Sequence, residues 1–516
     1  MIKDSPIVLI PGPPPTPVIG WRGNMLQFFR DPLTYLSTVY RTYGNVAALA
    51  RGGNSNILAT VDNCPGTVFA FGPENNQAIL TQPDLFQSSP MSTTKLGHGP
   101  TTRLLSGIFS MNGDKHRQQR RLMMPAFHKK RIEGYRDDMV AITKHMMDGW
   151  QVGSQRNAHE DMMELTLQIA CKTLFGVDTS AGDQNIGSMI QKWIQSNLNP
   201  LIMMKVNIPG TPYSRFIQMS EALDNALQAI LARKRREADT GDVLSMLIHM
   251  RDENGEQMTE DELVGQANIL FFAGHETTAN LLTWTLFLLN KHPEIYGRVM
   301  QELDSVLGGA DPTVEQLGKL EVLDRVLKES LRILSPVPFL LRVAMENTEL
   351  SGYRIPRGSE VIYSPYITHH MPEIYPEPQR FNPDRWLTSS PSSYEYLPFG
   401  AGIRMCIGAT FATMEAKIVL ATMLQRYHLA LPPEMPVNRS VMITFSPKAA
   451  CLCWYRSRRN DAFEAEARHS GRHRRTGTQF SVSIIFGASL AWPFSCTRFA
   501  GEKGENTAYA RATDGF

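Results

Sequence analysis

The stretch Phe399-Gly-Ala-Gly402-Ile-Arg404-Met-Cys406-Ile-Gly408 places a cysteine between glycines, directly before a predicted helix that runs from Gly408 to Tyr427. Glycine permits a positive φ angle and a close approach of the backbone to a flat ligand. The free amide groups and the positive dipole end at a helix start are expected to lower the pKa of the thiol, which favours a thiolate that binds a metal. The alternative interpretation is a buried structural cysteine in a glycine-rich loop. The combination of residues around Cys406 favours the metal ligand.

A long predicted helix precedes this loop and extends from Thr259 to Lys291. It opens with a capping sequence, contains no proline and is apolar on nearly every face, as expected for a helix through the middle of a large core. It carries the sequence Ala273-Gly274-His275-Glu276-Thr277-Thr278. A mid-helix threonine can donate a hydrogen bond to the carbonyl four residues earlier, here Ala273, and bend the helix locally. Without the cysteine loop, an ordinary threonine-rich core helix would be the preferred interpretation.

Charged residues recur at helical spacing in two further segments. Glu329 and Arg332 lie three residues apart on the helix predicted from Val322 to Leu334, so they share a face and can form an ion pair. His116 and Arg120 lie four residues apart on an earlier predicted helix and can bind an anionic group together. A basic residue of this kind, taken alone, is more often a solvated surface charge.

The remaining pattern is mainly helical. Helical periodicity dominates from about Gly113 to Leu334 and is interrupted at glycines and prolines. We predict one large, mainly α domain with small β regions (an α+β fold) over residues 1–456, and a disordered or non-native extension over residues 457–516. Short apolar and β-branched runs predict strands at Val46–Leu49, Ile57–Val61, around Arg342, at Glu360–Tyr363 and after Tyr427.

The composition narrows the class of protein. The formal net charge of +2 gives no indication of nucleic-acid binding. The six cysteines show no disulfide-framework spacing, which fits a reducing, cytoplasmic environment. The apolar run from Ile7 to Ile10 is too short for a membrane anchor or a signal peptide, so we expect no membrane attachment.

The cysteine loop resembles the haem-binding loop of the cytochrome P-450 family, F-x-x-G-x-R-x-C-x-G-x-x-x-A. All six fixed positions are present, and three further family motifs occur in the right order, so that the resemblance covers roughly residues 5–450. The six positions are Phe399, Gly402, Arg404, Cys406, Gly408 and Ala412.

The resemblance implies a fold in which haem b (iron protoporphyrin IX) lies between the long central helix and the cysteine loop, with Cys406 as the axial ligand of the iron. Arg404, His116, Arg120 and Arg342 then match positions that bind the haem propionates, although many family members carry tryptophan where this chain has His116. Arg385 completes a buried network with Glu329 and Arg332. Four residues of the long helix lie beside bound oxygen, where Thr277 and Glu276 deliver protons and Gly274 and Ala273 remove side-chain bulk.

The resemblance predicts a monooxygenase that inserts one atom of O₂ into an organic substrate. Two alternatives remain: a peroxide-dependent peroxygenase or isomerase-like haem-thiolate enzyme, and a non-catalytic haem protein that senses a gas or carries a ligand. The chain has no G-x-G-x-x-G fingerprint and no room for a fused reductase, so electrons are expected from a separate ferredoxin or flavodoxin with its reductase.

Positions that line the substrate pocket in the family are strongly apolar in this chain. An apolar substrate such as a fatty acid, a terpenoid or a hydrocarbon is therefore expected. The same residues could instead form ordinary core. They are Leu104, Leu105, Phe109, Leu201, Met203, Met204, Ile269, Leu270, Val337, Phe339, Leu340 and Met442.

Overall fold

A computed structural model of the chain describes residues 9–51, 55–57, 64–88, 99–151, 153–177, 186–197, 201–202, 205–237, 239–430, 439–441, 444–447 and 452–457. These residues belong to one compact unit, which ends at Arg458. The predicted extension after residue 457 lies outside the described residues and stays a prediction. Within the described part of the chain, no helix is both long and apolar enough to cross a membrane.

Helices make up most of this unit. The α-helices are α1 (Trp21–Arg30), α2 (Pro32–Tyr43), α3 (Pro73–Thr81), α4 (Pro100–Leu104), α5 (Gly113–Met123), α6 (Lys129–Gly134), α7 (Arg136–Asp148), α8 (Ala158–Phe175), α9 (Ile186–Asn197), α10 (Pro212–Lys234), α11 (Val243–His249), α12 (Glu260–Lys291), α13 (Pro293–Leu307), α14 (Val314–Leu317), α15 (Glu321–Ile333), α16 (Pro365–His369) and α17 (Ala409–Arg426). Short 3-10 helices include η1 (Ile108–Ser110), η2 (Met124–Phe127), η5 (Pro383–Leu387) and η6 (Gly402–Arg404).

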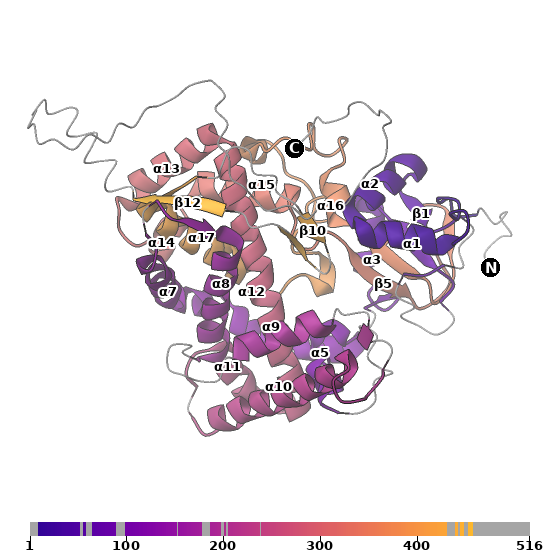
Figure 1. Ribbon diagram of the computed structural model, residues 1–516, viewed down its shortest axis with the longest axis horizontal. Coiled ribbons are helices and arrows are strands. Elements are labelled where there is room, and N and C mark those ends of the chain that lie inside the picture. Colours follow the sequence, from indigo (N-terminus) through magenta and orange to yellow (C-terminus); the bar gives the residue numbers. More distant parts are fainter. Residues whose placement is uncertain are drawn as a thin grey trace, which may run out of the picture. The chain divides into compact units, whose positions relative to one another are not determined.

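The long predicted helix is present as α12, and its start follows the predicted capping pattern. The Thr259 side chain accepts a hydrogen bond from the Glu262 amide, and the Glu262 carboxylate accepts one from the Thr259 amide. Residues on nearly all sides of α12 are buried, as expected for a helix inside a core. It packs most extensively on α8 and also on α15 and α17 (Figure 1). Because α12 is covered on several sides, side chains from several elements meet along it.

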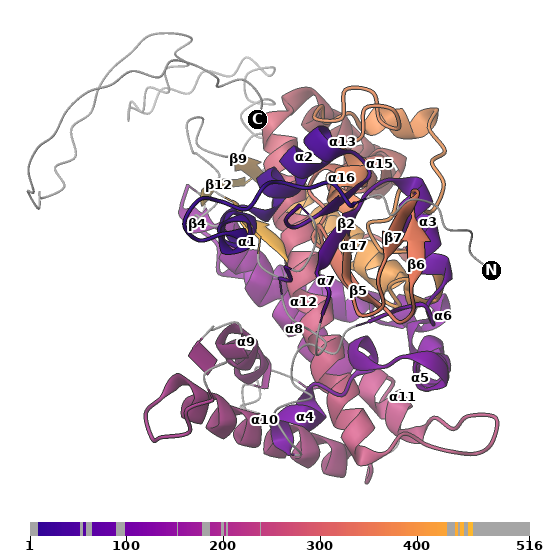
Figure 2. The same cartoon turned by 90° about the vertical axis from the view of Figure 1, so that its right-hand side faces the viewer.

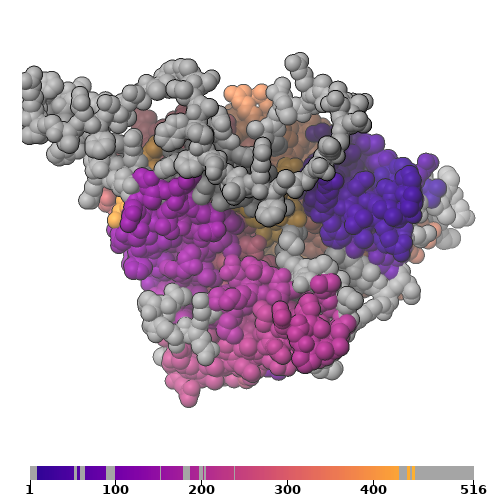
Figure 3. All heavy atoms as spheres, in the orientation of Figure 1, coloured from indigo at the N-terminus to yellow at the C-terminus, as the bar shows by residue number. Residues whose placement is uncertain are grey.

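Helices α9, α10 and α11 lie near the N-terminal end of α12, and α13 lies at its other end (Figures 1 and 2). Figure 3 shows that the surfaces of α8–α10, in magenta, and of α1 and α2, in indigo, occupy different parts of one face of the compact unit. Helix α2 begins with Asp31 as the cap and Pro32 at the first helical position.

Four small sheets accompany the helices. The largest has the order β1-β2-β8-β5-β3, in which β2 and β8 are parallel and the other neighbours are antiparallel. A three-stranded sheet has the order β4-β12-β9, and two hairpins pair β10 with β11 and β6 with β7. The strands are β1 (Val46–Ala48), β2 (Thr67–Ala70), β3 (Phe86–Gln87), β4 (Gln155–Asn157), β5 (Leu340–Ala344), β6 (Thr348–Leu350), β7 (Tyr353–Ile355), β8 (Glu360–Tyr363), β9 (Tyr427–Ala430), β10 (Arg439–Val441), β11 (Phe445–Pro447) and β12 (Leu452–Ser457).

The strands predicted near residues 46, 342 and 360 are confirmed as β1, β5 and β8. The prediction for Ile57–Val61 falls mostly outside the described residues. Strand β4 lies within the stretch in which helical periodicity was predicted to dominate, and the sequence analysis did not predict it. Its partner β12 lies almost 300 residues later, so no local pattern could reveal it.

A buried ion pair fixes the segment between α10 and α11. Lys234 Nζ lies 2.6 Å from Asp242 Oδ2, and the two side chains are 3% and 4% exposed. Asp242 also caps α11, because its Oδ1 accepts a hydrogen bond from the Ser245 amide at 2.9 Å. Removing one partner of such a pair leaves a buried charge uncompensated.

We expect Asp242→Ala to lower the free energy of unfolding of the holoenzyme by about 3–5 kcal/mol, because Lys234 would remain buried without its partner. Chemical denaturation followed by circular dichroism measures this loss. The control Asp239→Ala removes a nearby carboxylate that, among the described residues, forms an exposed ion pair with Arg131, and it should cost less than about 1 kcal/mol. Equal losses in the two variants would contradict the importance of the buried pair.

Candidate active site

The cysteine loop is held in a tight conformation by its own backbone. The Cys406 amide donates to the Phe399 carbonyl at 2.8 Å, and the Ala412 amide donates to the Gly408 carbonyl at 2.8 Å, where α17 begins. Gly402 has a φ of 69°, and a Cβ at this position would lie 2.4 Å from the Leu80 carbonyl oxygen of α3. Glycine is therefore required at 402 for both the dihedral angle and the contact. The loop places Cys406 two residues before the cap of α17, as predicted.

The environment of the Cys406 thiol differs from the expectation. The thiol is accessible, but protein atoms crowd around it, and this desolvation raises its pKa. The Gly408 amide and Arg120 act in the opposite direction and do not overcome desolvation. The amide at the helix start thus acts on the thiol pKa in the predicted direction, but the net shift of the protein alone is upward because desolvation is larger. A bound metal ion would itself deprotonate the thiol.

Basic side chains gather near this thiol from three separate segments. His116 and Arg120 lie on α5, Arg342 on β5 and Arg404 on η6. Burial, followed by Arg404, Arg120 and Arg342, lowers the pKa of His116 to about 4. Burial and the neighbouring Arg342 and Arg120 lower the pKa of Arg404 to about 10, although Tyr363 acts in the opposite direction. The four predicted residues are therefore brought together, and Arg120 is close enough to Cys406 for the two to interact.

This cluster suits an anionic group with several oxygen atoms. Within the described residues, His116 Nδ1 and Arg404 Nε are buried and have no hydrogen-bond partner. Arg404 uses its Nη2 for the Met111 carbonyl and the Asn112 side chain. Apart from burial, the groups that lower the His116 pKa are all arginines, whose positive charge disfavours a protonated His116. The donors present thus fit the two carboxylates of a haem whose iron is bound by Cys406.

Hydroxyl groups capture three successive carbonyls in the middle of α12. Thr277 Oγ1 donates to the Ala273 carbonyl at 2.7 Å, as predicted, and Thr278 Oγ1 donates to the Gly274 carbonyl at 2.9 Å. Thr166 Oγ1, on α8, donates to the His275 carbonyl at 3.0 Å. The Thr277 hydroxyl proton is thereby engaged, so the oxygen of this hydroxyl presents its lone pairs as an acceptor.

Gly274 packs near α8. The Cβ that it lacks would lie 3.5 Å from Leu174 Cδ1, which is an ordinary contact distance. Ala273 and Thr277, four residues apart, share one face of α12. The role predicted for Gly274 and Ala273 beside bound oxygen stays a prediction.

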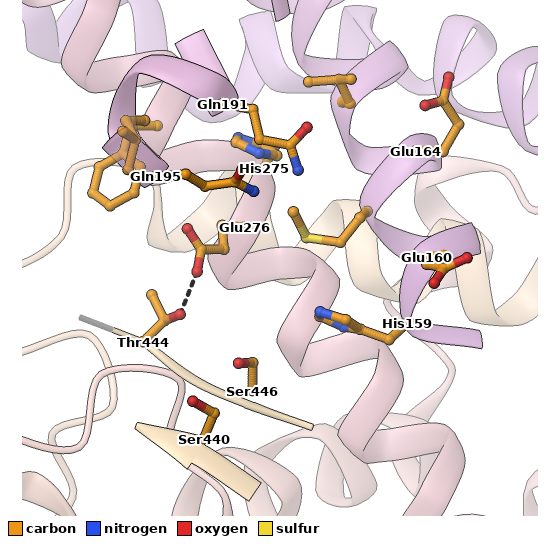
Figure 4. A pocket seen from close by; sticks show the side chains of 14 residues that line it. His159, Glu160, Glu164, Gln191, Gln195, His275, Glu276, Ser440, Thr444 and Ser446 are labelled. Atoms are coloured by element: carbon orange, nitrogen blue, oxygen red, sulfur yellow. Dashed lines mark hydrogen bonds between the residues drawn. The ribbon is translucent and has the colours of Figure 1, made fainter. Parts of the chain in front are cut away.

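Glu276 lies in a cavity on a neighbouring face of α12. Thr444 Oγ1 donates a short hydrogen bond to Glu276 Oε1, and burial raises the pKa of Glu276 despite this bond (Figure 4). Thr444 and Thr166 were not predicted as site residues. They lie 168 and 109 residues from their α12 partners, and no motif in the sequence marks either of them.

The predicted scaffold network is present and fully buried at its centre. Glu329 and Arg332 are both 0% exposed, and Arg332 Nη2 lies 2.9 Å from Glu329 Oε1. Arg385 Nε donates to the same oxygen at 2.9 Å. Trp386 Nε1 donates to Glu329 Oε2 at 3.1 Å, a contact that the sequence did not predict. Arg332 also donates to the carbonyls of His369 and Pro378, so it joins α15 to the segment that leads to the cysteine loop.

One predicted wall of the substrate pocket is attached directly to α12. Asn268 Nδ2 donates to the Leu104 carbonyl at 2.9 Å, and the Ile108 amide donates to Gln266 Oε1 at 3.0 Å. A Cβ on Gly265 would lie 2.9 Å from the Gly107 amide nitrogen, so the two backbones touch. Phe109 and Leu201 are each 54% exposed and are poor candidates for a closed wall. Met203, Met204 and Met442 lie outside the described residues.

Comparison with known proteins decides the family. The sequence pattern described as Cytochrome P450 matches residues 11–454. The chain belongs to the cytochrome P450 family. It is therefore a haem-binding monooxygenase that uses O₂ and a redox partner to oxidise an organic substrate.

Curated bacterial relatives of this cytochrome P450 include enzymes named for particular substrates. Cyclooctat-9-en-7-ol 5-monooxygenase of Streptomyces melanosporofaciens is 31% identical over 80% of this chain and 88% of its own length. Cyclooctatin synthase of the same organism is 32% identical over 79% of this chain and 87% of its own length. Pentalenene oxygenase of Streptomyces avermitilis is 28% identical over 84% of this chain and 94% of its own length.

Solved structures support the fold of this cytochrome P450. The retinoic acid-bound cyanobacterial CYP120A1 has a TM-score of 0.75 and 24% identity, and the match covers 88% of this chain and all of that one. The heme domain of cytochrome P450DA has a TM-score of 0.74 and 25% identity, and the match covers 88% of this chain and 98% of that one. The predicted mainly α fold with small β regions is confirmed.

We expect Arg332→Ala to give protein that is poor in haem and less stable by about 3–5 kcal/mol, because the buried Glu329 carboxylate would lose one of its two arginine partners. The ratio of Soret to protein absorbance and the thermal midpoint measure the two effects. Arg380→Ala is the matched control, because its side chain is 65% exposed and its ion pair is at the surface. A normal haem content in Arg332→Ala would contradict the scaffold role.

Proposed function

We propose that this enzyme binds haem b through Cys406 and inserts one oxygen atom into a terpenoid or a similarly apolar molecule. The observation that carries the proposal is the clustering of basic side chains beside the cysteine: Arg120 interacts with the Cys406 thiol, and His116, Arg342 and Arg404 lie close enough to Arg120 or to one another to interact electrostatically. A thiolate next to a cluster of cations matches the iron and the propionates of one haem.

In this proposal each predicted residue has a separate task. His116, Arg120, Arg342 and Arg404 bind the propionates, and Cys406 binds the iron. The backbone around Phe399, Gly402, Gly408 and Ala412 holds the cysteine loop in the conformation described above. Haem bound to a thiolate supplies the chemistry of O–O cleavage.

The residues of α12 supply protons for this chemistry. The Thr277 hydroxyl donates its proton in a hydrogen bond to the Ala273 carbonyl. Its oxygen can therefore accept a hydrogen bond from a bound molecule or from water. Glu276 is the preceding residue, and burial raises its pKa, which allows it to hold a proton closer to neutral pH. We assign Glu276 as the proton donor and Thr277 as the residue that positions the transfer.

The substrate class is supported by the relatives. Three curated relatives are named for cyclooctatin-type and pentalenene substrates or products. The described wall residues Leu104, Ile269 and Leu270 are apolar and at least partly buried, which suits such a molecule. A fatty acid and a hydrocarbon would also suit these apolar wall residues, and they are the competing substrate classes.

The redox partner in this proposal is a separate ferredoxin or flavodoxin with its reductase, in the cytoplasm. Turnover with NADPH and surrogate ferredoxin, compared with peroxide alone and with neither, separates this enzyme from a peroxygenase, an isomerase-like enzyme or a non-catalytic haem sensor or carrier. Product only with peroxide would favour the peroxygenase. Product in the absence of any oxidant would favour an isomerase-like enzyme, and no product under any condition would favour a sensor or carrier.

Reduced protein with carbon monoxide tests the metal ligand. We expect a long-wavelength Soret band, because thiolate ligation donates electron density to the iron. Cys406→Ala should lose this band, whereas Cys64→Ala, which changes a cysteine whose Sγ bonds to the Gly66 carbonyl, should keep it. A band that persists unchanged in Cys406→Ala would overturn the assignment.

Thr277→Ala tests the role of α12. We expect haem content and the substrate-induced spin shift to remain, while product per NADPH falls at least about tenfold and hydrogen peroxide accumulates, because proton transfer loses its positioning group. Thr283→Ala is the control, since Thr283 makes the same bond to a carbonyl four residues earlier, farther along α12. Undiminished product per NADPH in Thr277→Ala would count against the proton role.

A further inference from the structure

We propose that the cavity beside Glu276 binds a second small molecule, an organic cation with a guanidinium or ammonium head and a short alkyl chain. The inference goes beyond the proposed function, because it concerns a ligand other than haem and the oxidised substrate. It rests on the chemistry of the side chains around the cavity, and its tests measure binding without turnover.

The cavity has the size of a small-molecule site and reaches from the surface to buried polar groups. Its volume is about 430 Å³, within the range of ligand pockets in proteins. Residues of α8, α9, α12, β10 and β11 line it. Glu160 and Gln195 are exposed, whereas His275 is 2% and Thr444 is 5% exposed. A ligand that enters from solvent can therefore contact buried side chains.

The lining carries negative charge and no compensating positive charge. Its carboxylates are Glu160 and Glu164 of α8 and Glu276 of α12, and none of the described lining residues is a lysine or an arginine. Burial and the Thr444 hydroxyl are the influences that shift the pKa of Glu276, so no described cation neutralises this carboxylate. Clefts lined by one sign of charge concentrate ligands of the opposite sign. The lining therefore selects a cation.

A buried acceptor in the lining makes the same selection independently of charge. His275 Nδ1 lies 3.0 Å from the Phe271 carbonyl, which can only accept a hydrogen bond, so Nδ1 carries the proton. Its Nε2 is then an acceptor, and it is buried without a hydrogen-bond partner within the described residues. Burial lowers the pKa of His275, which keeps the ring neutral. A ligand with several N–H donors would satisfy this nitrogen, whereas an anion without donors would not.

Glu276 offers a contact for the cationic head. Thr444 Oγ1 donates a hydrogen bond to Glu276 Oε1 and thereby orients the carboxyl group (Figure 4). A carboxylate has lone pairs for further donors, and a guanidinium presents its N–H groups in a planar fork that matches a carboxylate. The apolar side chains that line the cavity suit the alkyl chain of the ligand. They include Met163, Leu167 and Ile194.

The lining suits an organic cation better than a metal ion. Divalent cations such as Ca²⁺ and Mg²⁺ take about six or more oxygen ligands in a defined geometry. The described residues contain no group of three side chains able to hold a metal ion. A metal ion would also leave the apolar part of the lining without a contact.

The probe for this site is n-butylguanidinium chloride, and n-butylurea is its uncharged counterpart of similar shape. The guanidinium group stays protonated and has no acceptor lone pair, so it does not act as a ligand of the haem iron. Isothermal titration calorimetry of the holoenzyme at low ionic strength measures both affinities. We expect n-butylguanidinium to bind at least about tenfold more tightly, because charge-assisted hydrogen bonds are stronger than neutral ones. Equal affinities, or no binding of either compound, would overturn the inference.

Two variants test whether the cation binds in this cavity. Glu276→Gln removes the charge and keeps an oxygen that accepts from Thr444, and Met163→Trp fills the space from α8. Glu221→Gln and Gln218→Trp are the matched controls, because they introduce the same residues at exposed positions of α10 outside the lining. We expect the affinity to fall at least about tenfold in both cavity variants and to change less than about twofold in the controls. Wild-type affinity in either cavity variant would place the ligand elsewhere and contradict the proposal.

The pH dependence of binding tests the contact with Glu276. Burial raises the pKa of Glu276 and is the main cause that lowers the pKa values of both histidines of the lining. We expect n-butylguanidinium to bind more tightly as the pH rises from about 5 to about 8, because Glu276 then loses its proton and gains its charge. Glu276→Gln should weaken this dependence, and an equal dependence in that variant would exclude Glu276 as the contact of the cationic head. The titratable groups that face the cavity are His159, Glu160, Glu164, His275 and Glu276.

Discussion

The concentration of positive charge beside the cysteine loop constrains the rest of this protein. His116, Arg120, Arg342 and Arg404 come from α5, β5 and η6, and the neighbours that shift the His116 pKa repel its protonated form. Placing like charges together away from water is unfavourable. A ligand that relieves this repulsion and binds only the folded chain stabilises the fold by mass action. Cofactor binding and the stability of this part of the fold are therefore linked. A separate buried network, in which Glu329 pairs with Arg332 and Arg385, joins α15 to the segment that leads to the cysteine loop.

Helix α12 combines two requirements that usually conflict. It must be rigid enough to pass through the core, and its middle must offer polar groups at a reactive site. Thr277, Thr278 and Thr166 meet both requirements, because their hydroxyls bind the carbonyls of residues 273–275 without an interruption of the helix. The Glu276 carboxyl group accepts a hydrogen bond from Thr444, which lies between β10 and β11, and its partner is therefore an uncharged hydroxyl.

Much of this arrangement could be predicted from the sequence because its signals are local. The capping residues of α12, the bond from Thr277 to Ala273 and the pairing of Glu329 with Arg332 all depend on spacings of three or four residues, which helical geometry fixes. The contacts of Thr166 and Thr444, strand β4 and the role of Trp386 depend on segments that meet only in the folded chain. The direction of the Cys406 pKa shift was missed for a related reason, since desolvation depends on the surrounding atoms and not on the motif.

The pairing of β4 with β12 has a consequence for the order of events during synthesis. β4 directly precedes α8, whose side chains bind α12 and line the Glu276 cavity, yet its partner in the sheet is residues 452–454. The ribosome must therefore translate nearly the whole catalytic region before this strand finds its neighbour. Non-local pairing of this kind slows folding, and domains form largely as units during synthesis. The start of α8 is consequently among the last parts of the enzyme to reach its final position on the nascent chain.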